Sequence, residues 1–260
     1  MPIAERFQGA NVIGAAKHSP YWGEHAARYK FALPIVEEKV VLDIACGTGY
    51  GLALLKETAK HITGVDVDIE AAREARSECD ERAAVLLGDG LRLPFDDQCF
   101  DVVTSFETLE HLHSRSEFLA ELRRVLRPGG KLVISTPNAN YTKPVNGKPS
   151  NPFHIFEYTP QELRAELDAH FHLEEFLGQT LDTAIRIPPF HDAQMRLPKD
   201  VGTQAKLFGW KVLNRMPLAV RESVSETVWK KPFYPTEKDY RFSTETVADA
   251  AVLVAVCSRI

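Results

Sequence analysis

The sequence lacks any run of about 18 apolar residues, the length that a membrane-spanning helix requires. Its first residues, MPIAERFQGA, lack the charged-then-apolar order of a secretion signal. We therefore expect no membrane span and a cytoplasmic location. The cysteines also lack C-x-x-C spacing, which indicates reduced thiols and argues against disulfides and against a cysteine zinc site; they are Cys46, Cys79, Cys99 and Cys257.

A surplus of positive charge is missing as well. Against 36 acidic residues the chain has 31 Lys and Arg, which gives a net charge of -5. Nucleic-acid binding relies on Lys and Arg to neutralise phosphates, so a nucleic-acid partner is not expected. Residues 182–247 are an exception, with eleven basic against eight acidic residues. This local surplus favours an anionic substrate, although a solvated surface explains it equally well.

Residues 40–51, VVLDIACGTGYG, are the most informative stretch of the chain. A buried strand, a glycine loop at Gly47, Gly49 and Gly51, and a following helix are predicted here. Glycines let the backbone approach a ligand, and the free amides of the helix attract an anionic group. The dinucleotide-binding pattern G-x-G-x-x-G is absent, because Leu52 occupies the place of its third glycine.

Residues 40–51 instead resemble motif I of the class I S-adenosylmethionine-dependent methyltransferases, with Asp43 before the run G-T-G-Y-G and Ala45 in place of the family's first glycine. A second strand, HITGVD, ends at Asp66, where a carboxylate accepts the ribose hydroxyls in nucleotide-binding folds. The later sequence LLGDGLRLPFDDQCFDVV also resembles this family, which implies that Asp89 binds the adenine amino group. The resemblance implies S-adenosyl-L-methionine as cofactor, held by Asp43, Ala45, Gly47, Thr48, Gly49, Asp66, Val67, Asp89, Gly90 and Phe106. In the helical run before the glycine loop, Arg28 is a candidate partner for the cofactor's carboxylate and Tyr29 or Trp22 a candidate wall, although core packing or surface solvation explains each of them more readily.

Strands and helices alternate through this region, which predicts an α/β fold with a parallel, doubly wound sheet. The resemblance covers roughly residues 36–180 and implies a Rossmann-like sheet of about seven strands, the last one antiparallel, with an insertion before it. We expect a helical cap over residues 1–36, interrupted at Pro34, a cofactor-binding core over 37–180, and the final strand within 248–260. Residues 181–247 are too long for a loop, so we interpret them as a lid, a substrate wall or a dimer contact.

The segment Glu107-Thr108-Leu109-Glu110-His111 follows the predicted central strand. If it is helical, both carboxylates and the imidazole share one face, although acids are also favoured in a first helical turn without any metal. Together with NPFHIFEYTP at 151–160, it resembles the metal site of the small-RNA 2′-O-methyltransferases. That resemblance implies a divalent cation, for which manganese and zinc suit the donors at least as well as magnesium, bound by Glu107, Glu110, His111 and His154.

These features together predict an O-methyltransferase that acts on a hydroxyl of a small polar acceptor, with His111, His113 or His154 as the general base. The segments SFETLEHL, ISTPN and NPFH resemble bacterial glycan-associated methyltransferases, which makes a sugar or glycan the preferred acceptor. A catechol or quinone precursor stays open as acceptor, as does a non-catalytic nucleotide-binding protein of the same fold. A homodimer is a further option.

Overall fold

The structure is a computed structural model that describes residues 19–260, so the part of the predicted cap within residues 1–18 lies outside the described residues. Its strands are β1 (Val40–Ile44), β2 (His61–Asp66), β3 (Ala83–Leu87), β4 (Phe100–Phe106), β5 (Leu126–Pro137), β6 (His172–Leu181), β7 (Tyr240–Ser243) and β8 (Val252–Ser258). Its α-helices are α2 (Trp22–Val36), α3 (Tyr50–Leu55), α4 (Ile69–Ala75), α5 (Arg115–Val125), α6 (Ala139–Thr142), α7 (Pro160–Asp168), α8 (His191–Gln194), α9 (Val201–Asn214) and α10 (Leu218–Val224). The 3₁₀ helices are η3 (Arg76–Glu78), η4 (Leu109–His111), η6 (Glu237–Asp239) and η7 (Thr244–Thr246), and one π-helix, η5, spans Ser225–Trp229.

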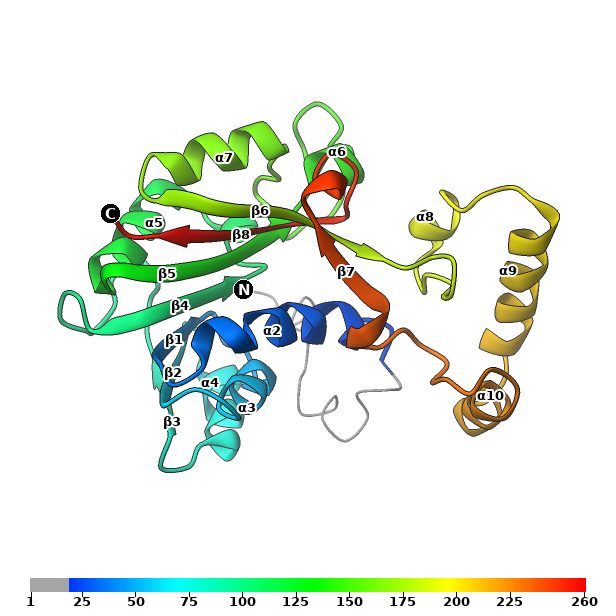
Figure 1. Cartoon of the computed structure of the whole chain (residues 1–260), viewed down its shortest axis with the longest axis horizontal. Coiled ribbons are helices and arrows are strands. Elements are labelled where there is room, and N and C mark those ends of the chain that lie inside the picture. Colours follow the sequence, from blue (N-terminus) through cyan, green and yellow to red (C-terminus); the bar gives the residue numbers. More distant parts are fainter. Residues whose placement is uncertain (1–18) are drawn as a thin grey trace. The chain divides into compact units, whose positions relative to one another are not determined.

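The strands form one eight-stranded sheet in the order β3-β2-β1-β4-β5-β8-β6-β7 (Figure 1). Strands β1 to β5 pair in parallel, whereas β8 runs antiparallel to both of its neighbours, β5 and β6. The predicted Rossmann-like α/β fold with an antiparallel last strand is confirmed. The eighth strand is β7, which begins within the segment that was predicted to be an insertion.

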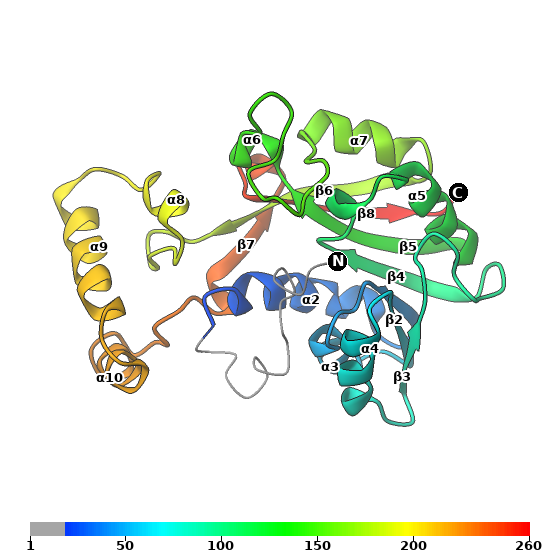
Figure 2. The ribbon, with the colours of Figure 1, turned by 180° about the vertical axis from the view of Figure 1, so that it is seen from behind.

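Helices cover both faces of this sheet: α2, α3 and α4 lie on one face and α5 and α7 on the other (Figures 1 and 2). The alternation of side chains along β1 divides its residues between the two faces. Leu42 and Ile44 enter the core that contains the apolar side chains of α5 and α7. Asp43, between them, is therefore directed to the opposite face, toward α2.

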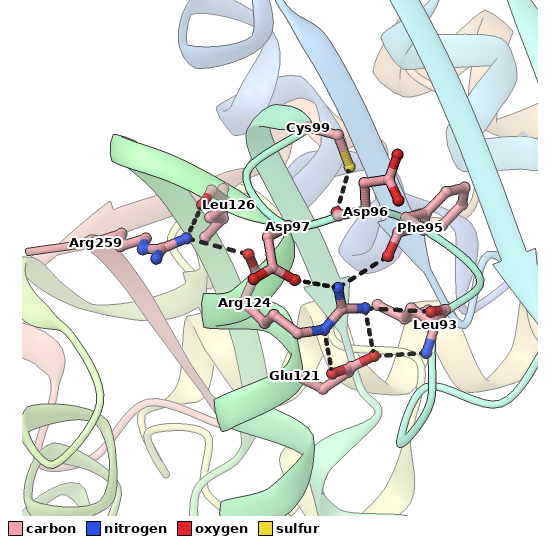
Figure 3. Close-up of polar contacts among 9 residues, drawn as sticks. All are labelled: Leu93, Phe95, Asp96, Asp97, Cys99, Glu121, Arg124, Leu126 and Arg259. Carbon is pink, nitrogen blue, oxygen red and sulfur yellow. Dashed lines mark hydrogen bonds and ion pairs between the residues drawn. The ribbon is translucent and has the colours of Figure 1, made fainter.

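The loop between β3 and β4 is fixed by Arg124 at the end of α5 (Figure 3). The Arg124 guanidinium donates to both carboxylate oxygens of Glu121, to Asp97, and to the carbonyls of Leu93 and Phe95. The hydrogen bonds from Arg124, together with that from the Leu93 amide, hold the pKa of Glu121 below its usual range, although burial opposes them. A single side chain thus connects α5 to the segment that follows the candidate adenine-binding residues.

Helix α2 corrects one prediction, because it continues through Pro34 to Val36 instead of being interrupted there. A proline within a helix removes the hydrogen bond that its amide would make to the carbonyl four residues earlier. Since Pro34 lies in the last turn, only that one bond at the end of the helix is lost, and the helix tolerates it.

Two compact units make up the described chain. One comprises residues 28–180 and 242–260, and the other comprises residues 19–27 and 181–241. In the second unit Trp210 stacks on Phe233 with ring centroids 5.2 Å apart, and Tyr234 is buried beside them. Trp210, Phe233 and Tyr234 are therefore packed inside this unit, whereas Trp229 is exposed. Within residues 19–260, no helix has the length and apolarity to cross a membrane.

Candidate functional site

The glycine loop joins β1 to α3 at the carboxyl edge of the sheet. Gly47 and Gly49 have φ values of 55° and 86°, the left-handed region that glycine adopts without strain. A Cβ on Gly49 would lie 2.8 Å from the Cβ of Ala75, so only glycine fits there. Ala45 also has a positive φ, 58°, which is strained for a residue with a Cβ. The glycine that the family has at this position is thus the residue that the backbone favours.

Asp43 supports this loop from inside the protein. Its side chain is fully buried, Oδ1 accepts from Thr104 Oγ1 at 2.6 Å, and Oδ2 accepts from Tyr29 Oη at 3.2 Å. Burial raises the pKa of Asp43 to about 7, even though these two hydrogen bonds lower it. Tyr29 was a candidate for the wall of the cofactor site, and the structure shows it bonded to Asp43. Thr104 was not predicted, because a threonine in a strand carries no functional pattern of its own.

The ends of β2 and β3 carry the residues predicted to bind the nucleoside. Asp66 is half-buried, with Oδ2 accepting from the Gly47 amide and Oδ1 from the Asp68 amide, both at 2.8 Å. Asp68 itself caps α4, because its side chain accepts from the amides of Glu70 and Ala71. Asp89 is exposed and accepts from the Leu91 amide at 2.9 Å. The carboxylates of two neighbouring parallel strands thus lie at one edge of the sheet.

Apolar side chains flank these carboxylates. Val67 is 68% exposed and Leu91 is 38% exposed, and they follow Asp66 and Asp89 by one and two residues. An apolar surface beside acceptor oxygens suits a flat base joined to a ribose. Leu91 was missed in the sequence, where an isolated leucine in a loop gives no signal.

The other residues predicted to bind the cofactor lie deeper. Thr48 is buried, and a Cβ on Gly90 would meet the Phe118 ring at 2.8 Å, which explains the glycine by packing. The Phe106 ring packs edge-on against Tyr29 with centroids 4.8 Å apart. Arg28 is 1% exposed, and its Nη1 donates to Gln179 Oε1 at 2.9 Å.

The acidic segment after β4 does not form the expected α-helix. Glu107 has a φ of 52°, and only Leu109–His111 form a short 3₁₀ helix, η4. The Glu107 amide donates to the carbonyl and the hydroxyl of Ser135, and Glu107 Oε1 accepts from the same hydroxyl at 2.7 Å. Because these bonds turn the chain before the helix begins, Glu107 does not share a helical face with Glu110 and His111.

Glu110, His111 and His154 form a group whose potential ligand atoms lie within 4.8 Å of one another. Glu110 is fully buried; its Oε2 accepts from Thr136 Oγ1 at 2.9 Å, and its Oε1 has no hydrogen-bond partner. Burial, and then the nearby Glu107 carboxylate, raise the pKa of Glu110 well above its ordinary value. The structure thus brings together three of the four predicted metal ligands. Glu107 lies outside the group.

Hydrogen bonds orient both imidazoles in the same way. His111 Nδ1 lies 3.0 Å from the Phe153 carbonyl oxygen, and His154 Nδ1 lies 2.7 Å from Glu157 Oε1. Such acceptors place the proton on Nδ1 and the lone pair on Nε2. The lone pair of His154 Nε2 accepts from the side-chain amide of Asn151, whose nitrogen lies 2.9 Å away. Although burial opposes them, the hydrogen bonds from His154 and Thr142 hold the pKa of Glu157 below its usual range.

Glu157 was not among the predicted site residues, although its place three residues after His154 was a usable signal. The third histidine suggested as a base, His113, is exposed and lies outside the group.

The fold is Rossmann-like, with Asp66 and Asp89 following β2 and β3 and with the group of Glu110, His111 and His154 as a second cluster of polar side chains. A family model described as "Methyltransferase domain" matches residues 42–134. A Mycolicibacterium smegmatis protein named "Probable S-adenosylmethionine-dependent methyltransferase" is 34% identical over 180 residues, which cover 68% of this chain and 70% of that protein. The chain belongs to the S-adenosylmethionine-dependent methyltransferases.

Two further comparisons agree with this family. A Mycobacterium tuberculosis protein of the same description is 37% identical over 172 residues, which cover 65% of this chain and 62% of that protein. The crystal structure of an S-adenosylmethionine-dependent methyltransferase from Mesorhizobium loti superposes with a TM-score of 0.53 at 16% identity, covering 93% of this chain and 98% of that one, and shows the shared fold.

Proposed function

We propose that this methyltransferase transfers a methyl group to a hydroxyl of a small polar acceptor, preferably a sugar or glycan, beside the group formed by Glu110, His111 and His154. The observation that carries the proposal is the pair of imidazoles with lone pairs on Nε2, held next to a buried carboxylate. The lone pair of His154 accepts from Asn151 Nδ2, a hydrogen bond that an acceptor hydroxyl or a cation would replace. This group follows β4, and β4 pairs directly with β1, the strand that leads into the glycine loop.

The cofactor, S-adenosylmethionine, supplies a methyl group already activated by a sulfonium. The residues proposed to hold it fit its parts: Gly47 and Gly49 leave the backbone accessible, Asp66 offers carboxylate oxygens to the ribose, and Val67 and Leu91 offer apolar surface to the base. The Asp66 carboxylate also accepts from the Gly47 amide, so the same side chain that we propose for the ribose holds the glycine loop in position.

A hydroxyl acceptor needs help from the protein, because an alcohol is a poor nucleophile near neutral pH. His111 or His154 removes the proton through Nε2, which for His154 requires that the acceptor hydroxyl replace the Asn151 amide. The carboxylate of Glu157 stabilises the imidazolium that forms on His154. Such proton transfer contributes typically about 10²- to 10⁴-fold to the rate. The remaining task of the side chains is to position the acceptor oxygen.

The same group also fits a divalent cation. Glu110 Oε1 is a buried oxygen without a hydrogen-bond partner, and the tautomers of His111 and His154 direct lone pairs from Nε2. Glu157 behind His154 is the kind of carboxylate that orients a metal-binding imidazole. One oxygen and two nitrogens suit manganese or zinc at least as well as magnesium. A cation bound there would lower the pKa of an acceptor hydroxyl.

The test is methyl transfer from labelled S-adenosylmethionine to a panel of glycosides and catechols, with and without EDTA. We expect transfer to a glycoside, and a fall of about 10²-fold or more in kcat for H111Q and H154Q. His172 is exposed and provides the matched control, since H172Q should keep full activity. H113Q tests the third candidate base separately.

Three outcomes would change the proposal. Full turnover in EDTA removes the cation and leaves the imidazoles as bases. Transfer only to catechols replaces the sugar. Equal activity of H111Q, H154Q and the wild-type protein refutes the catalytic role of the group. Calorimetry of D66A with S-adenosylmethionine tests the cofactor site independently, and binding as tight as that of the wild-type protein would contradict the ribose assignment.

A further inference from the structure

The second unit exposes an unusual amount of apolar surface. Of the twenty large hydrophobic side chains exposed among the described residues, ten lie in the short stretch of residues 195–229. They are Met195, Val201, Phe208, Val212, Met216, Leu218, Val220, Val224, Val228 and Trp229. Isolated exposed hydrophobic residues need no explanation, but a concentration of this kind marks a surface that contacts something other than water.

The apolar side chains follow the geometry of the helices. On α9, Leu207, Trp210 and Leu213 are buried in the core of the unit. Val201, Phe208 and Val212 are exposed at positions i, i+7 and i+11, which form a second stripe on another side of the same helix; their exposed fractions are 87%, 70% and 41%.

The next two helical segments also expose apolar side chains. On α10 and η5, Val220, Val224 and Val228 are exposed at spacings of four residues, and Trp229 is 48% exposed beside them. Neither helix therefore buries all of its apolar faces within the unit.

Positive charge accompanies these side chains. Residues 196–231 contain eight Lys and Arg against three acidic residues, a net charge of +5 in a chain whose total is -5. The basic members are Arg196, Lys199, Lys206, Lys211, Arg215, Arg221, Lys230 and Lys231, and the acidic ones are Asp200, Glu222 and Glu226. Lys211 follows Phe208 by three residues on α9, so the two side chains are neighbours on the helix, and Lys211 is exposed.

We propose that the exposed apolar surface of residues 195–229 docks on an anionic lipid bilayer, with α9 and α10 lying in the interface. An amphipathic helix with Lys and Arg near its apolar face and with Phe and Trp among the apolar residues is the usual form of such a contact. Trp229 next to Lys230 and Lys231 places an aromatic ring and two cations together, as at the level of lipid headgroups. A second copy of the chain fits less well, because self-association through this surface would bring two segments of charge +5 together.

The experiment is flotation of the full chain with vesicles of equal phosphatidylcholine and phosphatidylglycerol, compared with pure phosphatidylcholine. We expect binding to the anionic vesicles, weakened by salt, and little binding to the neutral ones. F208S and W229S should each weaken binding about tenfold, because each removes apolar area from the contact. K211Q should weaken it about fivefold. A blue shift of the fluorescence on binding should be absent in W229F.

The matched control is I260S, which changes an 81% exposed side chain outside the surface and should bind like the wild-type protein. All of these positions are exposed, so circular dichroism should show the wild-type fold in every variant. No flotation with anionic vesicles at low salt overturns the proposal, and so does flotation that F208S and W229S leave unchanged. The surface is assigned to self-association instead if the protein does not bind vesicles, sediments as a dimer, and becomes a monomer in the F208S variant. Because none of these measurements involves methyl transfer, their outcome is independent of the acceptor.

Discussion

The replacement of Asp43 by asparagine gives the sharpest test of how the strand that carries the cofactor loop is stabilised. The carboxyl group is fully buried between Thr104 and Tyr29, and its pKa is about 7 in the folded protein against 3.8 in the unfolded chain. An amide has the same shape; its oxygen accepts from Thr104, and its nitrogen donates to the Tyr29 oxygen. D43N therefore removes the charge while preserving both contacts.

The sign of the effect follows from proton binding. Between pH 3.8 and about 7 the folded state holds a proton on Asp43 that the unfolded state has lost, so the free energy of unfolding falls as the pH rises through this range. The two pKa values of Asp43 differ by roughly three pH units, which corresponds to about 4 kcal/mol in the free energy of unfolding. Above pH 7 the buried carboxylate is charged, and the free energy of unfolding of the wild-type protein is lowered by this full amount. D43N has no charge at this position and is not destabilised in this way.

Urea unfolding of both proteins without cofactor, at pH 5 and at pH 8, measures the difference. D43N should gain stability relative to the wild-type protein as the pH rises, by up to about 4 kcal/mol across the full range. The matched control is D101N, because the Asp101 carboxylate is paired with Arg127 and its pKa is lowered, so this variant should lose stability at both pH values. The reasoning is refuted if D43N is less stable than the wild-type protein by the same amount at pH 5 and pH 8.

Three further changes test the surroundings of the site. G51A should be destabilised by several kcal/mol and lose cofactor binding, because the new Cβ would lie 2.1 Å from the Tyr29 ring; a stable variant in thermal unfolding would contradict this. A45G should be more stable by up to about 1 kcal/mol, since it relieves a positive φ, and calorimetry should show unchanged or tighter cofactor binding; a loss of stability would refute the strain. T159A should cost about 1 kcal/mol in urea unfolding, because Thr159 and Glu162 form a capping box at the start of α7, and an unchanged midpoint would show that the cap contributes nothing.

The sequence by itself determined the sheet and the edge of the sheet at which we expect the cofactor of this family to bind. Alternating strands and helices with a glycine loop after the first strand permit few topologies, because parallel strands need crossover helices and their carboxyl ends gather at one edge. The places of Asp66 and Asp89 at the ends of β2 and β3 follow from that pattern alone. Local order along the chain sets these features, so they can be read without coordinates.

Only the tertiary structure decided which side chains meet. Ser135 holds Glu107 outside the group of Glu110, His111 and His154, and the Phe153 carbonyl orients His111 from 42 residues away in the sequence. Long-range hydrogen bonds of this kind leave no periodic trace in the sequence, because each depends on how separate segments pack. Burial is decided in the same way: the sequence presents Asp43 as a candidate ligand residue, whereas packing between β1, β4 and α2 encloses its carboxylate among protein donors.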